Sequence, residues 1–534
     1  TTGSYNSGFG YLSLSANNTG IQNSAFGWAS LIKNTTGSNN VAVGFDSLGE
    51  NTTANNNTAV GFEALTLNTT GSDNVAIGFR SLDANTTASN NTAVGYAALG
   101  ANTTATNNSG IGNLALTLNT TGAGNTAVGS QALYSNTTGS NSTAVGYNAL
   151  LSNTSVGGHT AVGTSALSSN TTGSANTAVG QNALLQNTTG HSNVAIGHSS
   201  ADANTTGERN TSVGYASLTS NTTGVKNTAV GMSALEDNTT GGNNTSVGNN
   251  CLVNNTTGGS NTAVGSVCMQ QNTTGSNNTA IGVASLDNNQ TGTNVTALGS
   301  YSLRYSTANS NTAVGHASQN NTTSGAENTS VGYKSLDANT TGYDNNAFGR
   351  DALGGVTTGV KNTAVSTAGT SITTGDNNLM LGYNAGSSAS PSGTISTADN
   401  NICLGDNGIA NLFCKVSTIQ TSDIRDKTDI NDFNHGLSWV EKLRPITYRW
   451  DMRSNYQNGI PDGSKKEKKL HLGFIAQEEL EIEKEHGFAN DKNDMLLVNE
   501  NYDGNYGMHY DRLVPILVNA IKELSAKVTA LEVG

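Results

Sequence analysis

Residues 57–73 read N-T-A-V-G-F-E-A-L-T-L-N-T-T-G-S-D, and residues 74–90 repeat the pattern as N-V-A-I-G-F-R-S-L-D-A-N-T-T-A-S-N. The glycine of this unit recurs every 17 residues from Gly10 to Gly299. A one-residue deletion then shifts its phase, and the later copies are Gly315, Gly332, Gly349, Ser366 in place of glycine, Gly382 and Gly405. A fixed short period predicts a solenoid in which each repeat forms one coil.

Large apolar residues recur at two positions of the unit. The residue before the glycine is Val, Ile, Phe or Leu, and the residue four after it is Leu in most copies, as with Val60 and Leu65. We expect these two columns to supply the core of a parallel β-solenoid, with two short strands and two turns per coil. Glycine and asparagine tolerate the left-handed backbone that the corners require, and their density disfavours a helix.

Stacked coils place equivalent residues about 4.8 Å apart, so Asn, Val and Leu should form ladders. Two large apolar side chains per coil make a thin core, because each ordered residue costs on the order of 1.5 kcal/mol of conformational entropy. We therefore expect several chains to associate and to share their ladders.

The distribution of charge divides the chain near residue 421. Residues 422–534 hold 20 acidic and 15 basic residues, which leaves 17 and 9 for everything before them. Trp439 and Trp450 also lie in this last part, where they can seed a compact core. The sequence predicts a repeat shaft over 1–366, an irregular β neck over 367–421 and an α+β domain over 422–534.

Composition excludes several classes of partner. The net charge is −13, and no Lys/Arg-rich stretch precedes residue 422, so nucleic acid is not an expected partner. No run of 18 apolar residues occurs, so no membrane insertion is expected. Cys403 and Cys414 have no metal-ligand spacing, and we expect neither a metal nor a cofactor.

Two features of the repeats leave alternatives open. Cys251 and Cys268 lie 17 residues apart and should stack in adjacent coils, either as small buried thiols in place of Ala or as a disulfide. The N-T-T triplets fit the N-glycosylation sequon, but they also fit a turn that is repeated for its geometry, and the second interpretation is favoured.

The strongest motifs lie in the C-terminal region. They are S-D-I-R-D-K-T-D-I from Ser422, L-G-F-I-A-Q-E from Leu472 and Y-D-R-L-V-P-I-L-V-N-A-I-K-E-L from Tyr510. Together they resemble the self-cleaving intramolecular chaperone of endosialidase-type phage tail spikes and fibres, the peptidase S74 family. The repeats resemble the Asn-Thr-Gly-rich shafts of tail fibres and, in style rather than period, the head repeats of trimeric autotransporter adhesins.

This resemblance implies a cut between Thr421 and Ser422, with Ser422 as nucleophile and Lys427 as base. A serine hydroxyl attacks only when a base takes its proton, and a lysine becomes such a base only when it is desolvated. Without the surrounding motif, the same pair would be interpreted as a capped, solvated turn. The expected reaction is one self-cleavage, with no external substrate.

The last stretch predicts a helix with a heptad seam over 514–531. Its apolar residues alternate spacings of three and four, and they are Val514, Leu517, Ile521, Leu524, Val528 and Leu531. We expect a trimeric coiled coil, and the alternative is a helix packed on its own domain. Near-identical coils can slip by 17 residues, so register must come from outside the repeats.

The sequence thus predicts an extracellular homotrimeric fibre subunit, on a virion tail or a cell surface, whose receptor by family analogy is a surface glycan. Two alternatives remain. One is a shaft whose regular Thr arrays bind ice or another ligand, and the other is a glycan-degrading tail spike with its enzyme domain upstream.

Overall fold

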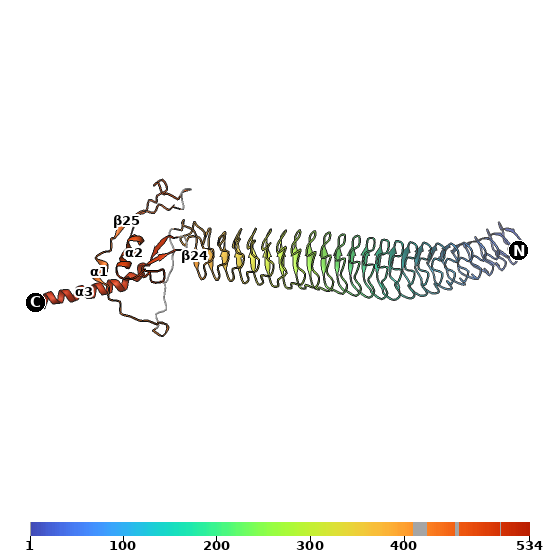
Figure 1. The fold of residues 1–534 in the computed structure, drawn as a ribbon. Coiled ribbons are helices and arrows are strands. Elements are labelled where there is room, and N and C mark those ends of the chain that lie inside the picture. Colours follow the sequence, from blue (N-terminus) through green and yellow to red (C-terminus); the bar gives the residue numbers. More distant parts are fainter. Residues whose placement is uncertain (1, 410–423, 454–455, 457–458, 502–503, 534) are drawn as a thin grey trace. The chain divides into compact units, whose positions relative to one another are not determined.

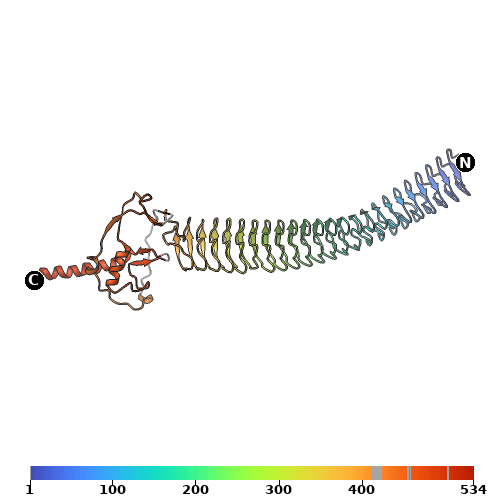
Figure 2. The same ribbon diagram turned by 45° about the horizontal axis from the view of Figure 1, so that its top comes forward.

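The computed structural model describes residues 2–409, 424–453, 456, 459–501 and 504–533, in two units that divide after Thr329. Residues 2–329 form parallel solenoid coils (Figures 1 and 2), each with one three-residue strand in register with its neighbours. The strands are β1 (Ser7–Phe9), β2 (Ser24–Phe26), β3 (Val41–Val43), β4 (Thr58–Val60), β5 (Val75–Ile77), β6 (Thr92–Val94), β7 (Ser109–Ile111), β8 (Thr126–Val128), β9 (Thr143–Val145), β10 (Thr160–Val162), β11 (Thr177–Val179), β12 (Val194–Ile196), β13 (Thr211–Val213), β14 (Thr228–Val230), β15 (Thr245–Val247), β16 (Thr262–Val264), β17 (Thr279–Ile281), β18 (Thr296–Leu298) and β19 (Thr312–Val314). The predicted parallel β-solenoid of 17-residue repeats is confirmed.

The second unit begins with further coils and ends with an α+β domain. Strand β20 (Thr329–Val331) lies at the division, and β21 (Asn346–Phe348), β22 (Thr363–Val365), β23 (Leu379–Leu381) and β24 (Ile402–Leu404) follow in parallel. The C-terminal elements are η1 (Ile424–Asp426), α1 (Leu437–Val440), β25 (Ile446–Tyr448), β26 (His471–Gly473), α2 (Ala476–Glu485), β27 (Val498–Glu500), β28 (Tyr506–Met508), η3 (Tyr510–Arg512) and α3 (Leu513–Val533). β25 pairs with β26 and β27 with β28, both antiparallel.

The prediction of two strands per coil is wrong, because each coil has only one. After the strand and its glycine, the backbone turns through left-handed residues such as Glu63 (φ 52°) and Leu65 (φ 55°). This arm still bonds to the next coil, since the Leu65 N–H donates to Ser81 O at 3.0 Å. This segment is therefore not a strand, although its backbone still forms hydrogen bonds to the next coil.

The core of a coil consists of one leucine with small residues. Ala59 and Leu65 are fully buried, whereas Val60 is partly exposed. The middle residue of the strand faces inward, so its two neighbours face outward. The expectation that both large apolar columns build the core is therefore wrong for the valine column.

Glycine is required at the motif position for two reasons: the backbone has a positive φ there, and the next coil approaches closely. Gly61 has φ 144°, and a Cβ placed on it would lie 2.3 Å from the carbonyl oxygen of Gly78 in the next coil. No other residue type fits this corner without moving the neighbouring coil. The predicted role of the glycines at corners is confirmed.

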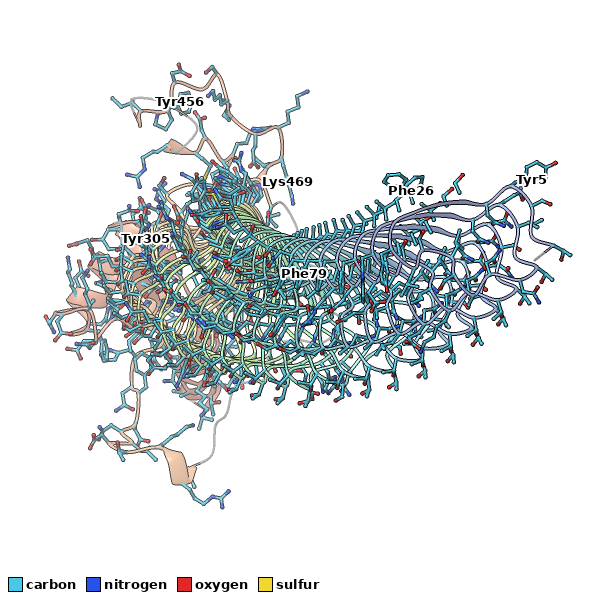
Figure 3. All side chains as sticks on the ribbon, turned by 90° about the vertical axis from the view of Figure 1, so that its right-hand side faces the viewer. Tyr5, Phe26, Phe79, Tyr305, Tyr456 and Lys469 are labelled. Atoms are coloured by element: carbon cyan, nitrogen blue, oxygen red, sulfur yellow. The ribbon has the colours of Figure 1, made fainter. Side chains whose placement is uncertain are left out.

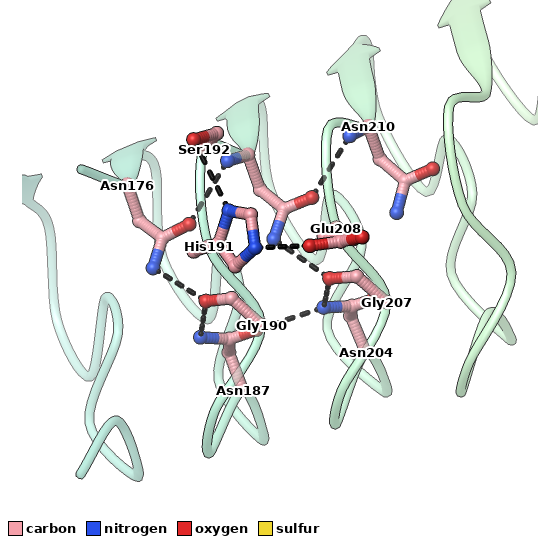
Figure 4. A network of polar contacts seen from close by, with 10 residues as sticks. Asn176, Asn187, Gly190, His191, Ser192, Asn204, Gly207, Glu208 and Asn210 are labelled. Atoms are coloured by element: carbon pink, nitrogen blue, oxygen red, sulfur yellow. Dashed lines mark hydrogen bonds and ion pairs between the residues drawn. The ribbon is translucent and has the colours of Figure 1, made fainter. Parts of the chain in front are cut away.

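Two columns of buried asparagine fill the rest of the interior (Figure 4). Asn187 Nδ2 donates to Gly190 O at 3.0 Å and to Asn170 Oδ1 of the preceding coil at 2.8 Å. Its Oδ1 accepts a bond from Asn204 Nδ2 of the next coil at 2.8 Å. Asn176, from the second column, also donates to Gly190 O, at 2.8 Å. These buried amides are satisfied only while neighbouring coils stay stacked.

This geometry decides between the two interpretations of the N-T-T triplets. Asn187 begins such a triplet, and its Nδ2, the atom to which a glycan would be attached, is buried and makes two hydrogen bonds. The structure supports a turn repeated for its geometry. Cys251 and Cys268 are likewise free, buried thiols that replace Ala, and each donates to a backbone carbonyl at 3.3 Å.

His159 interrupts one asparagine column. The Asn176 N–H donates to His159 Nδ1 at 3.3 Å, so the neutral ring carries its proton on Nε2. That Nε2 is buried and has no hydrogen-bond partner among the described residues. Burial lowers the pKa of His159 to about 4, because the interior disfavours the charged ring.

We expect acid to weaken the shaft at His159. The unfolded histidine binds its proton near pH 6.5 and the folded one near pH 4, so stability falls as the pH drops through this window. The loss below pH 4 should be roughly 3 kcal/mol. The substitution His159→Asn restores the column residue and should remove this part of the pH dependence, measured by hydrogen exchange of residues 143–180 at pH 7 and pH 4. Equal acid sensitivity in both chains would contradict the assignment.

Candidate functional site

Two of the three motif stretches meet in the C-terminal domain. The Phe474 N–H, just after β26, donates to the Tyr510 hydroxyl oxygen at 3.1 Å. A Cβ on Gly473 would lie 2.5 Å from that same oxygen, so only glycine allows this approach. The motif residues therefore join β26 to the start of the C-terminal helix.

The predicted cleavage residues are placed only in part. Thr421 and Ser422 lie outside the described residues. Lys427 follows η1 directly, and its side chain is exposed in the single chain. A base role needs a desolvated ammonium group, so burial of Lys427 would have to come from a partner or a rearrangement. The pairing of Ser422 with Lys427 stays a prediction.

Helix α3 packs on its own domain only through its first turns. Leu513, Ile516 and Ala520 are buried against the domain. The Leu437 N–H at the start of α1 donates to Glu523 Oε2 at 2.9 Å, which fixes α1 beside α3. The six residues of the predicted seam are between 42% and 82% exposed: Val514, Leu517, Ile521, Leu524, Val528 and Leu531. Packing on the domain therefore leaves the seam uncovered.

A buried carboxylate that the sequence did not indicate organises the core of the domain. Glu483 of α2 is fully buried. Its Oε1 accepts the N–H groups of Leu497 at 2.6 Å and Val498 at 2.8 Å, and its Oε2 accepts that of Leu496 at 2.8 Å. Three charge-assisted bonds thus hold the segment that enters β27.

A second buried glutamate pairs with the predicted core tryptophan. Trp439 is fully buried, and its Nε1–H donates to Glu479 Oε1 at 2.7 Å. Burial raises the pKa of Glu479, and the hydrogen bond from Trp439 opposes this shift. His486 stacks on Trp439 with ring centroids 4.6 Å apart. Its Nδ1 lies 2.8 Å from Ile482 O and must donate there, and its Nε2 lies 3.4 Å from Ser438 Oγ.

Two other kinds of feature, a metal site and a membrane-spanning helix, are absent from the part of the chain that the structure describes. No group of three or more His, Cys, Asp or Glu side chains is arranged to hold a metal ion there. Among the same residues, no helix has the length and apolar character needed to cross a membrane.

Comparison with protein families gives one match. Residues 422–488 match the family model described as the chaperone of endosialidase, Peptidase_S74. The match begins at the predicted nucleophile and extends through α2, so it covers the first two motif stretches and not the repeats. Comparison with curated proteins and with solved structures gave no match.

Loss of the Glu483 charge should weaken this domain. In Glu483→Gln, the amide nitrogen would face backbone N–H groups that now donate to a carboxylate, so at least one buried donor loses its acceptor. We expect unfolding of the domain, followed by Trp439 fluorescence in urea, to become easier by about 2–3 kcal/mol. The control Glu481→Gln changes an exposed residue of the same helix and should stay within about 0.5 kcal/mol of the native chain. Equal effects of the two substitutions would contradict the role of Glu483.

Proposed function

We propose that the chain is a subunit of a homotrimeric fibre whose C-terminal domain joins three chains, sets their register and then cleaves itself before Ser422. The family match and the β-solenoid support a structural protein of the tail-fibre or tail-spike type. In this proposal residues 1–366 form the shaft, 367–421 the neck and 422–534 the chaperone, on a virion tail or another extracellular appendage.

The exposed seam of α3 is the observation that carries the proposal. The 21-residue helix packs on its own domain through Leu513, Ile516 and Ala520, and it leaves the six seam residues exposed. Contiguous exposed apolar surface marks an interaction site, and spacings of three and four fit other helices with the same seam. Three copies of α3 would bury these residues and align the chains that precede them.

Self-cleavage would follow from assembly. Ser422 Oγ attacks the carbonyl carbon of Thr421, and Lys427 takes the hydroxyl proton and returns it to the departing nitrogen of Ser422. Water then hydrolyses the resulting ester and releases a chain that ends at Thr421. Because Lys427 is exposed in the single chain, its activation would depend on the neighbouring subunits. The shaft would then serve as a spacer or an adhesive surface, with a surface glycan as its receptor by family analogy.

The first test is the mass of the expressed chain. The native chain should yield a fragment ending at Thr421, whereas Ser422→Ala and Lys427→Ala should assemble but keep the full 54.5 kDa in denaturing mass spectrometry. Ser438→Ala, at an exposed serine of the same domain, is the control and should be cut as the native chain is. Normal cutting of Ser422→Ala would remove Ser422 from the mechanism.

The second test concerns the seam. Ile521 is 67% exposed in the single chain, so Ile521→Asp should leave the domain folded while placing a charge in the seam. We expect native mass spectrometry to change from trimer to monomer, and cleavage to fail with it. Lys522→Asp, at the adjacent exposed position, should remain trimeric. A trimer that survives Ile521→Asp would rule out the seam as the trimer contact.

A further inference from the structure

The shaft has an outer strand face that one chain leaves uncovered. We define it, within residues 2–329, as the first and third residues of strands β1 to β19 and the residue that follows each motif glycine. The third strand residue is Val, Ile, Leu or Phe in every one of these strands. These side chains point away from the coil, because the middle residue points into it. Figure 3 labels Phe26 and Phe79 on this face.

This face carries no Asp, Glu, Lys or Arg at any of its positions in residues 2–329. The charged residues of the same unit lie at other positions of the coil, and some of them pair between neighbouring coils. Lys33 Nζ, for example, lies 2.7 Å from Glu50 Oε2. Depletion of charge on an outward surface is characteristic of the core of a protein–protein interface, not of a solvated face.

Six aromatic rings form a ladder on this face in the first coils. Successive centroids from Trp28 to Tyr96 lie 4.6–5.4 Å apart with interplanar angles of at most 10°, and Tyr11 lies 6.3 Å from Trp28. The rings are 39–68% exposed. The ladder consists of Tyr11, Trp28, Phe45, Phe62, Phe79 and Tyr96. In the next coils Asn113 and Ser130 take the same position, so the apolar surface is widest at the ladder.

The arrangement of the rings favours a second copy of the chain as the occupant. Each ring covers the face of its neighbour and turns its edge outward, so a planar ligand or a sugar finds few ring faces on which to stack. A second copy presents apolar columns with the same coil spacing, which can stay in contact from coil to coil. Six half-exposed rings with the valines and phenylalanines beside them offer on the order of 800 Å², the area that each partner contributes to a standard stable interface.

We infer that the outer strand face, and the aromatic ladder most of all, is the surface through which the shafts of neighbouring subunits contact each other. This inference rests on the proposed trimer and adds to it the part of the shaft that is buried. The C-terminal seam would bring the chains together at one end, and the ladder would hold the coils of residues 7–96.

Trp28 is a built-in reporter of this contact, because the other two tryptophans, Trp439 and Trp450, lie in the C-terminal domain. The difference in fluorescence between the native chain and Trp28→Phe isolates its emission while keeping an aromatic ring in the ladder. In the assembled fibre we expect this emission to be blue-shifted and its acrylamide quenching to be severalfold weaker than in dissociated chains. Equal quenching in both states would overturn the inference.

A matched control places the reporter elsewhere on the shaft. Leu67 is 49% exposed, close to the 47% of Trp28, but it lies outside the outer strand face. In Trp28→Phe/Leu67→Trp, quenching should be the same before and after assembly. Protection at position 67 without protection at Trp28 would assign the contact to another face. Phe62→Ser should also lower the dissociation temperature of the fibre, whereas Leu67→Ser should not.

The outcomes separate this inference from the proposed function. A chain that stays monomeric in native mass spectrometry would remove both. A trimer in which acrylamide quenches Trp28 as strongly as in dissociated chains would contradict only the inference that the outer strand face is the contact.

Discussion

Each coil of the shaft is completed by the coil beside it, and the rest of the structure depends on this constraint. The asparagine amides in the interior find partners in the equivalent residues one period away, as Asn187 does between Asn170 and Asn204. A residue that departs from its column leaves a buried polar atom without its partner, as His159 Nε2 does among the described residues. The strict repetition of the sequence follows from this chemistry, because an unpaired buried polar group costs more than a hydrogen bond contributes.

The same constraint directs large apolar residues outward. The approach of Gly61 to Gly78 keeps neighbouring coils close, and the interior of the coil holds Ala59 and Leu65. Val60 and Phe62 remain outside. A single chain therefore has satisfied polar groups in its interior and leaves columns of large apolar side chains on its surface. Helix α3 repeats this division, with Ile516 buried and Ile521 exposed. Two separate regions of the chain thus leave apolar surface for a partner.

Spacing alone was enough to predict the solenoid, the corner glycines, the leucine column and the C-terminal helix. The number of strands was not predictable, because Glu63 and Leu65 adopt left-handed backbone that neither residue type favours. The outward direction of Val60 depends on which face of a three-residue strand the coil encloses, and a pattern of three residues does not specify it. Glu483 was missed because a glutamate on an amphipathic helix usually faces solvent. Its partners, Leu496 to Val498, reach it only through the folded chain.

The repetition that stabilises each coil leaves the register between chains poorly defined. Two chains that slip by one period still form nearly all of the same ladder contacts. Two features oppose this. The C-terminal domain lacks the 17-residue repeat, so in the proposed trimer a slip by one period would not restore the contacts of the seam. Within residues 2–329, the coil that joins Thr296 to Thr312 is one residue shorter than the others, and a slipped neighbour would oppose it with a coil of a different length. Once the ladders have formed in the correct register, sliding requires many contacts to break together. After the C-terminal domain had been cleaved off, the barrier to sliding would then keep the shaft in register, more than the energy difference between registers would.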